Sequence, residues 1–118
     1  MNNINVIDSI LSKSVTVNYP EYGDIILVLP KPDRMIKVNQ AFDNILGDEN
    51  ASLSKHNLVA ATALWACLDD DHEINDMLPV LAATGGIAGN LAQEALSLCG
   101  YGQQVREAFS EGDADLPT

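Results

Sequence analysis

The first 30 residues change from a helical to an alternating pattern of apolar positions. Isoleucine and leucine recur at helical spacing over residues 4–11, which predicts a short leading helix. Valines then alternate with polar residues over 15–18, and a β-branched run follows at 24–29. Because a proline- and glycine-containing turn separates these two segments, we predict a β-hairpin over about residues 14–30.

Most of the remaining chain has apolar residues at helical spacing. Residues 34–38 fit either a third strand or the start of a helix, and we favour a helix from about residue 38 that Gly47 terminates. A glycine pair and Gly89 interrupt the later pattern, where we expect a turn with close packing at Gly89. The pattern predicts further helices over residues 52–68, 76–83, 87–99 and 103–110, with Gly100 as the cap that ends the third of these.

The longest of these predicted helices has recognisable ends and one apolar stripe. Ser52 or Ser54 can cap its start, and the acidic run 69–73 should lie beyond its end, because carboxylates oppose the helix dipole there. In the next helix, Asp76 is the expected cap. Leu58, Ala61, Trp65 and Leu68 form the stripe, with Val59 and Thr62 beside it.

These elements predict a mainly α (α+β) protein, with a small N-terminal β-hairpin followed by a compact bundle of about four helices. Its length of 118 residues suits a single domain, which we place at residues 1–112, with the helical part at 38–110. The acidic segment 113–118 is expected to be a flexible tail.

Charge narrows the classes of function. The formal net charge is −11, of which residues 61–118 carry −9 and contain Arg106 as their one base. This balance argues against binding to nucleic-acid phosphates or to an anionic membrane surface. The chain also has no apolar run long enough for a membrane span and no signal-peptide pattern, so we expect an intracellular protein with reduced thiols.

Two segments contain residues typical of ligand-binding loops, but neither matches a complete binding motif. A calcium loop starting at Asp69 would need glycine and glutamate where Ile74 and Val80 stand. The glycines at 85–89 follow a proline-interrupted segment, and they lack the order and βαβ context of a dinucleotide fingerprint. We therefore predict a solvated acidic loop and an interhelical turn, with no metal or cofactor.

The chain has few candidates for nucleophilic catalysis. Cys67 and Cys99 both adjoin apolar helix positions, and free cysteine is among the most buried residue types. The two histidines, His56 and His72, share no recognisable motif with either cysteine. We expect packed thiols and a solvated His72, and no enzyme activity.

The order of features in the second half carries a family resemblance. An apolar helix ends in an acidic turn (ALWACLDDD, 63–71), a short helix follows (INDMLPVL, 74–81), and the last helix ends in an aliphatic-glycine sequence (LAQEALSLCGYG, 91–102). This order resembles the tail assembly chaperones of long, non-contractile-tailed (siphophage-type) bacteriophages. The resemblance covers about residues 24–102, including an N-terminal β element followed by a helix. One departure is that the family's acidic turn often contains glycine, where this chain has His72 and Glu73.

The resemblance implies a non-catalytic protein of the host cytoplasm that binds and solubilises the helical tape measure protein during tail assembly and is absent from the mature virion. It further implies contact with the tail tube protein, a frameshifted longer form of the chain, and a homo-oligomer. Our predicted partner contacts are Trp65, Leu81, Ile87 and Leu91, although Trp65 also fits a core position. The alternative function is an acidic protein-binding inhibitor or DNA mimic, which needs carboxylates spaced like phosphates.

Overall fold

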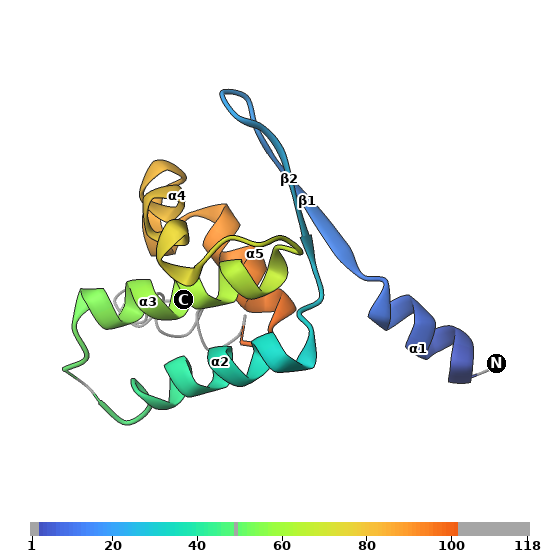
Figure 1. The fold of residues 1–118 in the computed structure, drawn as a ribbon, viewed down its shortest axis with the longest axis horizontal. Helices are drawn as coiled ribbons and strands as arrows, with labels where there is room; N and C mark the ends of the chain where they lie inside the picture. Colours follow the sequence, from blue (N-terminus) through green and yellow to red (C-terminus); the bar gives the residue numbers. More distant parts are fainter. Residues whose placement is uncertain (1–2, 49, 102–118) are drawn as a thin grey trace, which may run out of the picture.

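The structure, a computed structural model, describes residues 3–48 and 50–101. Its first element is the helix α1 (Asn3–Leu11), which leads into an antiparallel hairpin of β1 (Ser14–Tyr19) and β2 (Gly23–Val28). The leading helix and the hairpin are therefore confirmed. Figure 1 shows α1 projecting from the end of the hairpin, away from the other helices.

The hairpin turns one of its faces toward the helices. Val15 lies opposite Leu27 and Val17 opposite Ile25 in the register, and these four side chains pack on the core. Leu27 is fully buried, whereas Ile26 on the other face is exposed. A two-stranded hairpin is marginal in water without such packing, so the helical body stabilises it.

Four α-helices follow the hairpin, and α3 is central among them. It lies between α2 on one side and α4 and α5 on the other (Figure 1). With α1, the described residues form five α-helices, so the α+β class is confirmed but the helix count exceeds the predicted four. The elements are α2 (Pro32–Asp43), α3 (Leu53–Cys67), α4 (Met77–Ala83) and α5 (Asn90–Leu98), with the 3-10 helices η1 (Ile74–Asp76) and η2 (Gly86–Ala88).

Burial around α3 differs from the predicted single stripe. Every residue from Val59 to Leu64 is buried, because neighbouring helices cover several sides of this segment. Within the predicted stripe, Leu58 is 42% exposed, whereas Trp65 and Leu68 are half-buried against the core. The alanines of α3 allow this close approach of its neighbours. Its ends match the prediction: Ser52 caps the start by accepting a hydrogen bond from the Lys55 N–H, and the helix stops before the acidic run.

The ambiguous segment 34–38 is helical, and α2 begins at Pro32, six residues earlier than predicted. Proline is favoured in the first turn of a helix because its fixed φ suits the helix and no N–H is lost there. The helix ends at Asp43, and Gly47, with φ +78°, belongs to the following turn and does not cap the helix directly.

Close backbone packing shapes the turn between α4 and α5. A Cβ atom on Gly89 would lie 2.2 Å from the carbonyl oxygen of Thr84, so the predicted close packing is confirmed. Gly85 adopts φ +102°, which glycine accepts without steric cost. The last described helix starts at Asn90, not at residue 87, and Ile87 lies in η2.

Both ends of α5 receive hydrogen-bond partners. At its start, the Leu91 N–H donates to the hydroxyl oxygen of Tyr19 in the hairpin, 3.2 Å away. At its end, Gly100 has φ +90° and donates to the Ser97 carbonyl, which confirms the predicted glycine cap. The hairpin thus helps to fix the helix that packs most extensively on α3.

Three predictions about the C-terminal part lie outside the described residues. These are the helix over 103–110, the domain boundary at 112 and the tail 113–118. Among the described helices, none has the length and apolar character to cross a bilayer.

Candidate functional site

Two surface hollows border α3, one between α3 and α4 and the other between α2, α3 and η1. We call them together the α3–α4 face. Each has an exposed leucine in its lining, Leu78 in the first hollow and Leu58 in the second, with exposed fractions of 39% and 42%. These are apolar groups that the fold leaves in contact with water.

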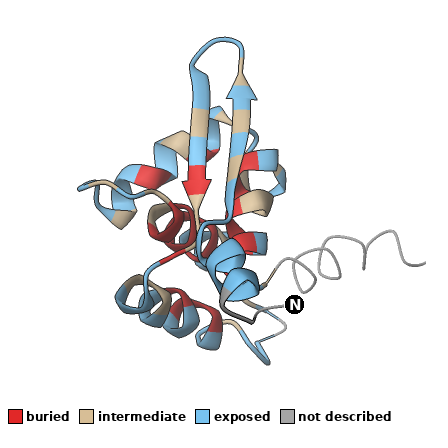
Figure 2. Cartoon of the chain, turned by 90° about the vertical axis from the view of Figure 1, so that its right-hand side faces the viewer, coloured by how far each residue is buried: buried red, intermediate tan, exposed pale blue. Residues whose placement is uncertain are grey.

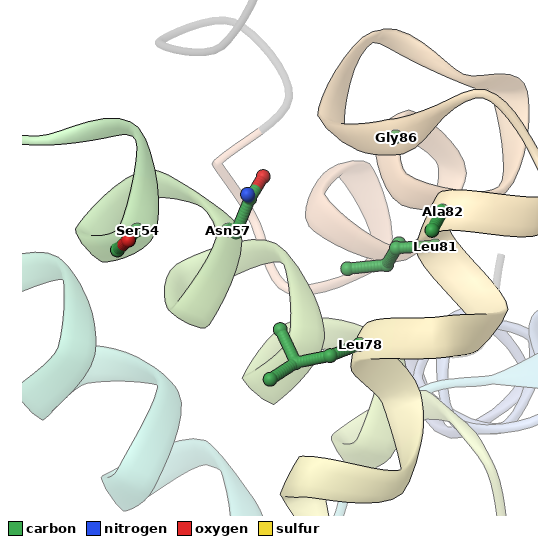
Figure 3. A pocket seen from close by; sticks show the side chains of 6 residues that line it. All are labelled: Ser54, Asn57, Leu78, Leu81, Ala82 and Gly86. Carbon is green, nitrogen blue, oxygen red and sulfur yellow. The ribbon is translucent and has the colours of Figure 1, made fainter.

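The first hollow, of about 330 Å³, lies between the start of α3 and α4. Leu78 and Leu81 project from α4 toward α3 (Figure 3). Ser54 and Asn57 supply polar groups from the opposite wall, and Ala82 adds a small apolar surface. A cleft with apolar walls and few polar groups suits an apolar side chain from a partner.

The second hollow, of about 370 Å³, lies between α2, the middle of α3 and η1. Leu58, Trp65 and Ile74 provide its apolar lining, while Lys37 and Glu73 place opposite charges in it. Trp65 combines a large apolar surface with a polar N–H, which makes tryptophan common at the energetic centres of protein interfaces.

Arg34 of α2 fixes the wall that contains Trp65. Its guanidinium lies 4.4 Å from the centre of the Trp65 ring. The same group donates hydrogen bonds to three carbonyl oxygens at the end of α3, those of Trp65 (2.7 Å), Leu68 (2.7 Å) and Asp70 (2.6 Å). Trp65 belongs to the last turn of α3, and Leu68 and Asp70 follow its end, where intrahelical donors run out, so one arginine side chain provides donors for all three carbonyls.

The acidic turn after α3 borders the second hollow and is only partly neutralised. Asp69 pairs with Lys31 at 3.2 Å, and the Asp70 carboxylate lies 3.0 Å from His72 Nδ1. The hydrogen bond with Asp70, reinforced by its charge, raises the pKa of His72. Partial burial pushes the pKa of Asp70 upward, but the His72 backbone N–H and ring outweigh it and lower that pKa. The exposed side chain of His72 agrees with the predicted solvated residue.

The predicted partner contacts fall in different environments. Trp65 lines the second hollow and Leu81 lines the first, although Leu81 itself is only 2% exposed. Ile87 is half-buried against the core. Leu91 is fully buried, so the expectation that it contacts a partner is corrected: helical periodicity gave its position on α5, but that face of α5 packs inward.

Sequence reasoning missed Leu58, Leu78 and Arg34. Leu58 belongs to the predicted apolar stripe of its helix, and the pattern does not distinguish Leu78 from its apolar neighbours. For Arg34 a signal was present, since it is one of only six Lys and Arg residues and lies in the first turn of a helix that starts with proline. Its partners are backbone atoms, which a side-chain pattern cannot identify.

A second exposed apolar surface lies on α1. Val6, Ile7, Ile10 and Leu11 are 44–64% exposed, and α1 makes no extensive contact with another element in the described part of the chain. Figure 2 shows this helix in the colour of exposed residues. An isolated helix of nine residues is marginal in water, so α1 is expected to be stabilised by packing against a partner.

The thiols and imidazoles do not come together. Cys67 and Cys99 are buried free thiols, as predicted, whereas His72 is on the surface. His56 Nδ1 lies 3.0 Å from the carbonyl oxygen of Ser52, within its own helix. Among residues 3–48 and 50–101, no three His, Cys, Asp or Glu side chains are grouped as metal ligands.

Comparison of the chain with known protein families, curated proteins and solved structures found no match.

Proposed function

We propose that this chain is a non-catalytic tail assembly chaperone that binds an apolar helical segment of the tape measure protein and keeps that protein soluble in the host cytoplasm. In this proposal the chain leaves before the virion is complete. The order of sequence features described above is its starting point, and the α3–α4 face is its proposed binding surface.

One observation carries the proposal. Two hollows of about 330 and 370 Å³ border α3, the first against α4 and the second against α2 and η1, and each contains an exposed leucine in its lining. A helix that docks in a groove places side chains at i, i+3 or i+4 into successive pockets. Two hollows along α3 suit two such side chains. Burying the remaining surface of Leu58 and Leu78 would contribute about 1 kcal/mol each.

The acidic turn beside the second hollow supports the choice of partner. Asp71 and Glu73 are exposed, and neither forms an ion pair in the described part of the chain. A partner helix with basic residues flanking its apolar positions would find opposite charge there, which favours fast association. The large negative charge of the chain would also keep a complex with an apolar partner in solution.

The same proposal includes a homo-oligomer formed through α1. Asp8 and Lys13 are the two charged residues in the segment 3–13, so this segment is neutral overall while the chain carries −11. Two copies can therefore approach at α1 with less repulsion than at the acidic helical body. Pairing of the two apolar stripes would bury the four side chains that the fold leaves exposed.

Co-expression with the tape measure protein of the same genome tests the function. We expect the tape measure protein to stay in the soluble fraction and to co-elute with this chain. Insoluble tape measure protein beside a folded chain would contradict the proposal. Binding to basic nucleic-acid-binding proteins that weakens steeply with salt would favour the acidic inhibitor or DNA mimic instead.

A further inference from the structure

Cys67 and Cys99 meet in the core although 31 residues separate them in the sequence. Cys67 is the last residue of α3, and Cys99 directly follows α5. Their sulfur atoms are 3.8 Å apart, within sulfur hydrogen-bonding distance, and the two side chains are 0% and 8% exposed. The helices that bear them form the most extensive helix–helix contact of the fold.

Besides the other sulfur, each thiol has one backbone carbonyl oxygen within sulfur hydrogen-bonding distance. The Cys67 thiol donates to the carbonyl oxygen of Ala95 at 3.4 Å, and the Cys99 thiol lies 4.0 Å from that of Ala63. A disulfide needs the sulfurs about 2 Å apart, with side-chain geometry that neighbouring helices can provide. From 3.8 Å, each sulfur must move toward its partner and away from these carbonyl oxygens.

We propose that Cys67 and Cys99 are an oxidation site, at which hydrogen peroxide converts the two thiols into an intramolecular disulfide that joins the end of α3 to the end of α5. The inference is independent of the proposed function. It concerns a pair of residues that the α3–α4 face does not use.

The chemistry proceeds in two balanced steps. The Cys99 thiolate attacks one peroxide oxygen, the O–O bond breaks, and the departing hydroxide takes up a proton to become water, leaving a sulfenic acid on Cys99. The Cys67 thiol then gives up its proton as its sulfur attacks the Cys99 sulfur, the S–O bond breaks, and the departing hydroxide takes up that proton and leaves as a second water. Overall, two thiols and one peroxide give one disulfide and two waters.

The order of the two cysteines follows from their positions. Cys99 retains some exposure and lies next to the end of α5, where local opening needs less free energy than in the middle of the core. Cys67 has no exposed surface. The hydrogen bond with Cys99 and burial raise the pKa of the Cys67 thiol far above its usual range, which keeps it protonated and unreactive toward peroxide, so Cys99 is oxidised first.

Closing the bond would restrict the segment between the two cysteines. That segment contains η1, α4 and η2, and it therefore includes one wall of both hollows. A cross-link that closes a loop of this length stabilises mainly by restricting the unfolded chain, and it should raise the melting temperature by about 10 °C.

Peroxide treatment of the folded protein tests the proposal. After the reaction is quenched, the protein is unfolded, alkylated and digested for mass spectrometry. We expect loss of two hydrogen atoms from the intact mass, one peptide that links Cys67 to Cys99, and a melting temperature that falls again after reduction. Two alkylated thiols, a disulfide between molecules, or an internal disulfide that lowers the melting temperature would each overturn it.

Single-cysteine variants separate the roles. In Cys67→Ser, we expect a sulfenic-acid probe such as dimedone to label Cys99. In Cys99→Ser, we expect Cys67 to stay unlabelled as long as the protein is folded. Cys67→Ala and Cys99→Ala repeat the comparison if a buried serine impairs folding. Labelling of Cys67 at the same rate as Cys99 in folded variants would overturn the assigned order.

Discussion

The guanidinium of Arg34 stacks on the Trp65 ring and at the same time donates to the Trp65 carbonyl oxygen, so one side chain holds both the backbone and the ring of this residue. The two residues are 31 positions apart and belong to α2 and α3. This contact fixes a wall of the second hollow and the start of the acidic turn. It joins the stability of the fold to the shape of the proposed binding face.

Arg34→Ala should therefore destabilise the protein by about 2–4 kcal/mol, because carbonyl groups at the end of α3 lose a charged donor and Trp65 loses its stacked cation. Arg34→Lys should fall between the alanine variant and the wild type, since an ammonium group cannot span all three acceptors. Urea unfolding measures both. An alanine variant within about 0.5 kcal/mol of the wild type would contradict this role.

The α3–α4 face should lose its partner when charge is placed in the hollows. Leu58→Glu and Leu78→Glu each bury a carboxylate in an apolar contact and should weaken tape measure binding at least about 10-fold, with little effect on folding because both positions are exposed. Leu46→Glu is the matched control, since Leu46 is 64% exposed and does not line either hollow. Equal binding by all three variants, measured by co-elution and titration, would place the interface elsewhere.

Gly89→Ala should destabilise the turn between α4 and α5. Its Cβ would lie 2.2 Å from the Thr84 carbonyl oxygen, and backbone must move to accept it, so we expect a loss of about 1–3 kcal/mol. Gly47→Ala is an informative comparison, because its added Cβ meets no atom within 4 Å and only the positive φ is unfavourable. That variant should lose about 1 kcal/mol. Comparing the thermal unfolding of Gly89→Ala and Gly47→Ala separates the cost of the steric clash from the cost of the positive φ.

The pair of Asp70 and His72 should make stability depend on pH. The pKa of His72 is raised, so its contribution is complete below the unfolded value near 6.5 and is lost as pH rises through the folded pKa. The pKa of Asp70 is lowered, so its contribution is present above about 3.8 and is lost as pH falls through the folded pKa. His72→Gln should therefore be destabilising at about pH 5 and neutral at about pH 9. An equal effect at both pH values would contradict the ion pair.

Self-association should depend on α1 and strengthen with salt. Ile7→Glu and Ile10→Glu interrupt its apolar stripe and should give monomers, whereas Ser9→Glu, which adds the same charge on the polar side, should weaken association far less. Salt screens the repulsion between chains of net charge −11 and should shift the equilibrium toward the oligomer. Sedimentation velocity over a range of concentrations measures this. A wild-type chain that stays monomeric throughout would refute the role of α1.

Sequence patterns predicted where the helices and strands lie better than they predicted which residues are buried. Alternation and turn residues located the hairpin, and Ser52, Gly89 and Gly100 acted at the turns and caps expected of them, because such signals depend on local backbone geometry. Periodicity also located α3, but its burial depends on how many neighbours surround it. Val59–Leu64 is buried all round, which no single-face pattern can indicate.

The candidate site was predictable only in part, for the same reason. Trp65 and Leu81 were expected on a partner surface, and both line the hollows, but Leu91 was placed on that surface and lies in the core. Leu58 and Leu78 resemble core leucines in sequence, and only the packing of α3 against α4 leaves them exposed. Arg34 contacts backbone atoms more than thirty residues away, so residue type alone could not assign its role.

Hydrogen exchange on the complex with the tape measure protein tests the central claim most directly, because it locates the contact surface along the chain. Our account predicts that amides of residues 74–82 and of the first turns of α3 exchange more slowly in the complex than in the free protein, while the hairpin turn at 19–23 is unchanged. Unchanged exchange over 74–82 in a verified complex, with protection confined to other segments, would contradict the assignment of the α3–α4 face.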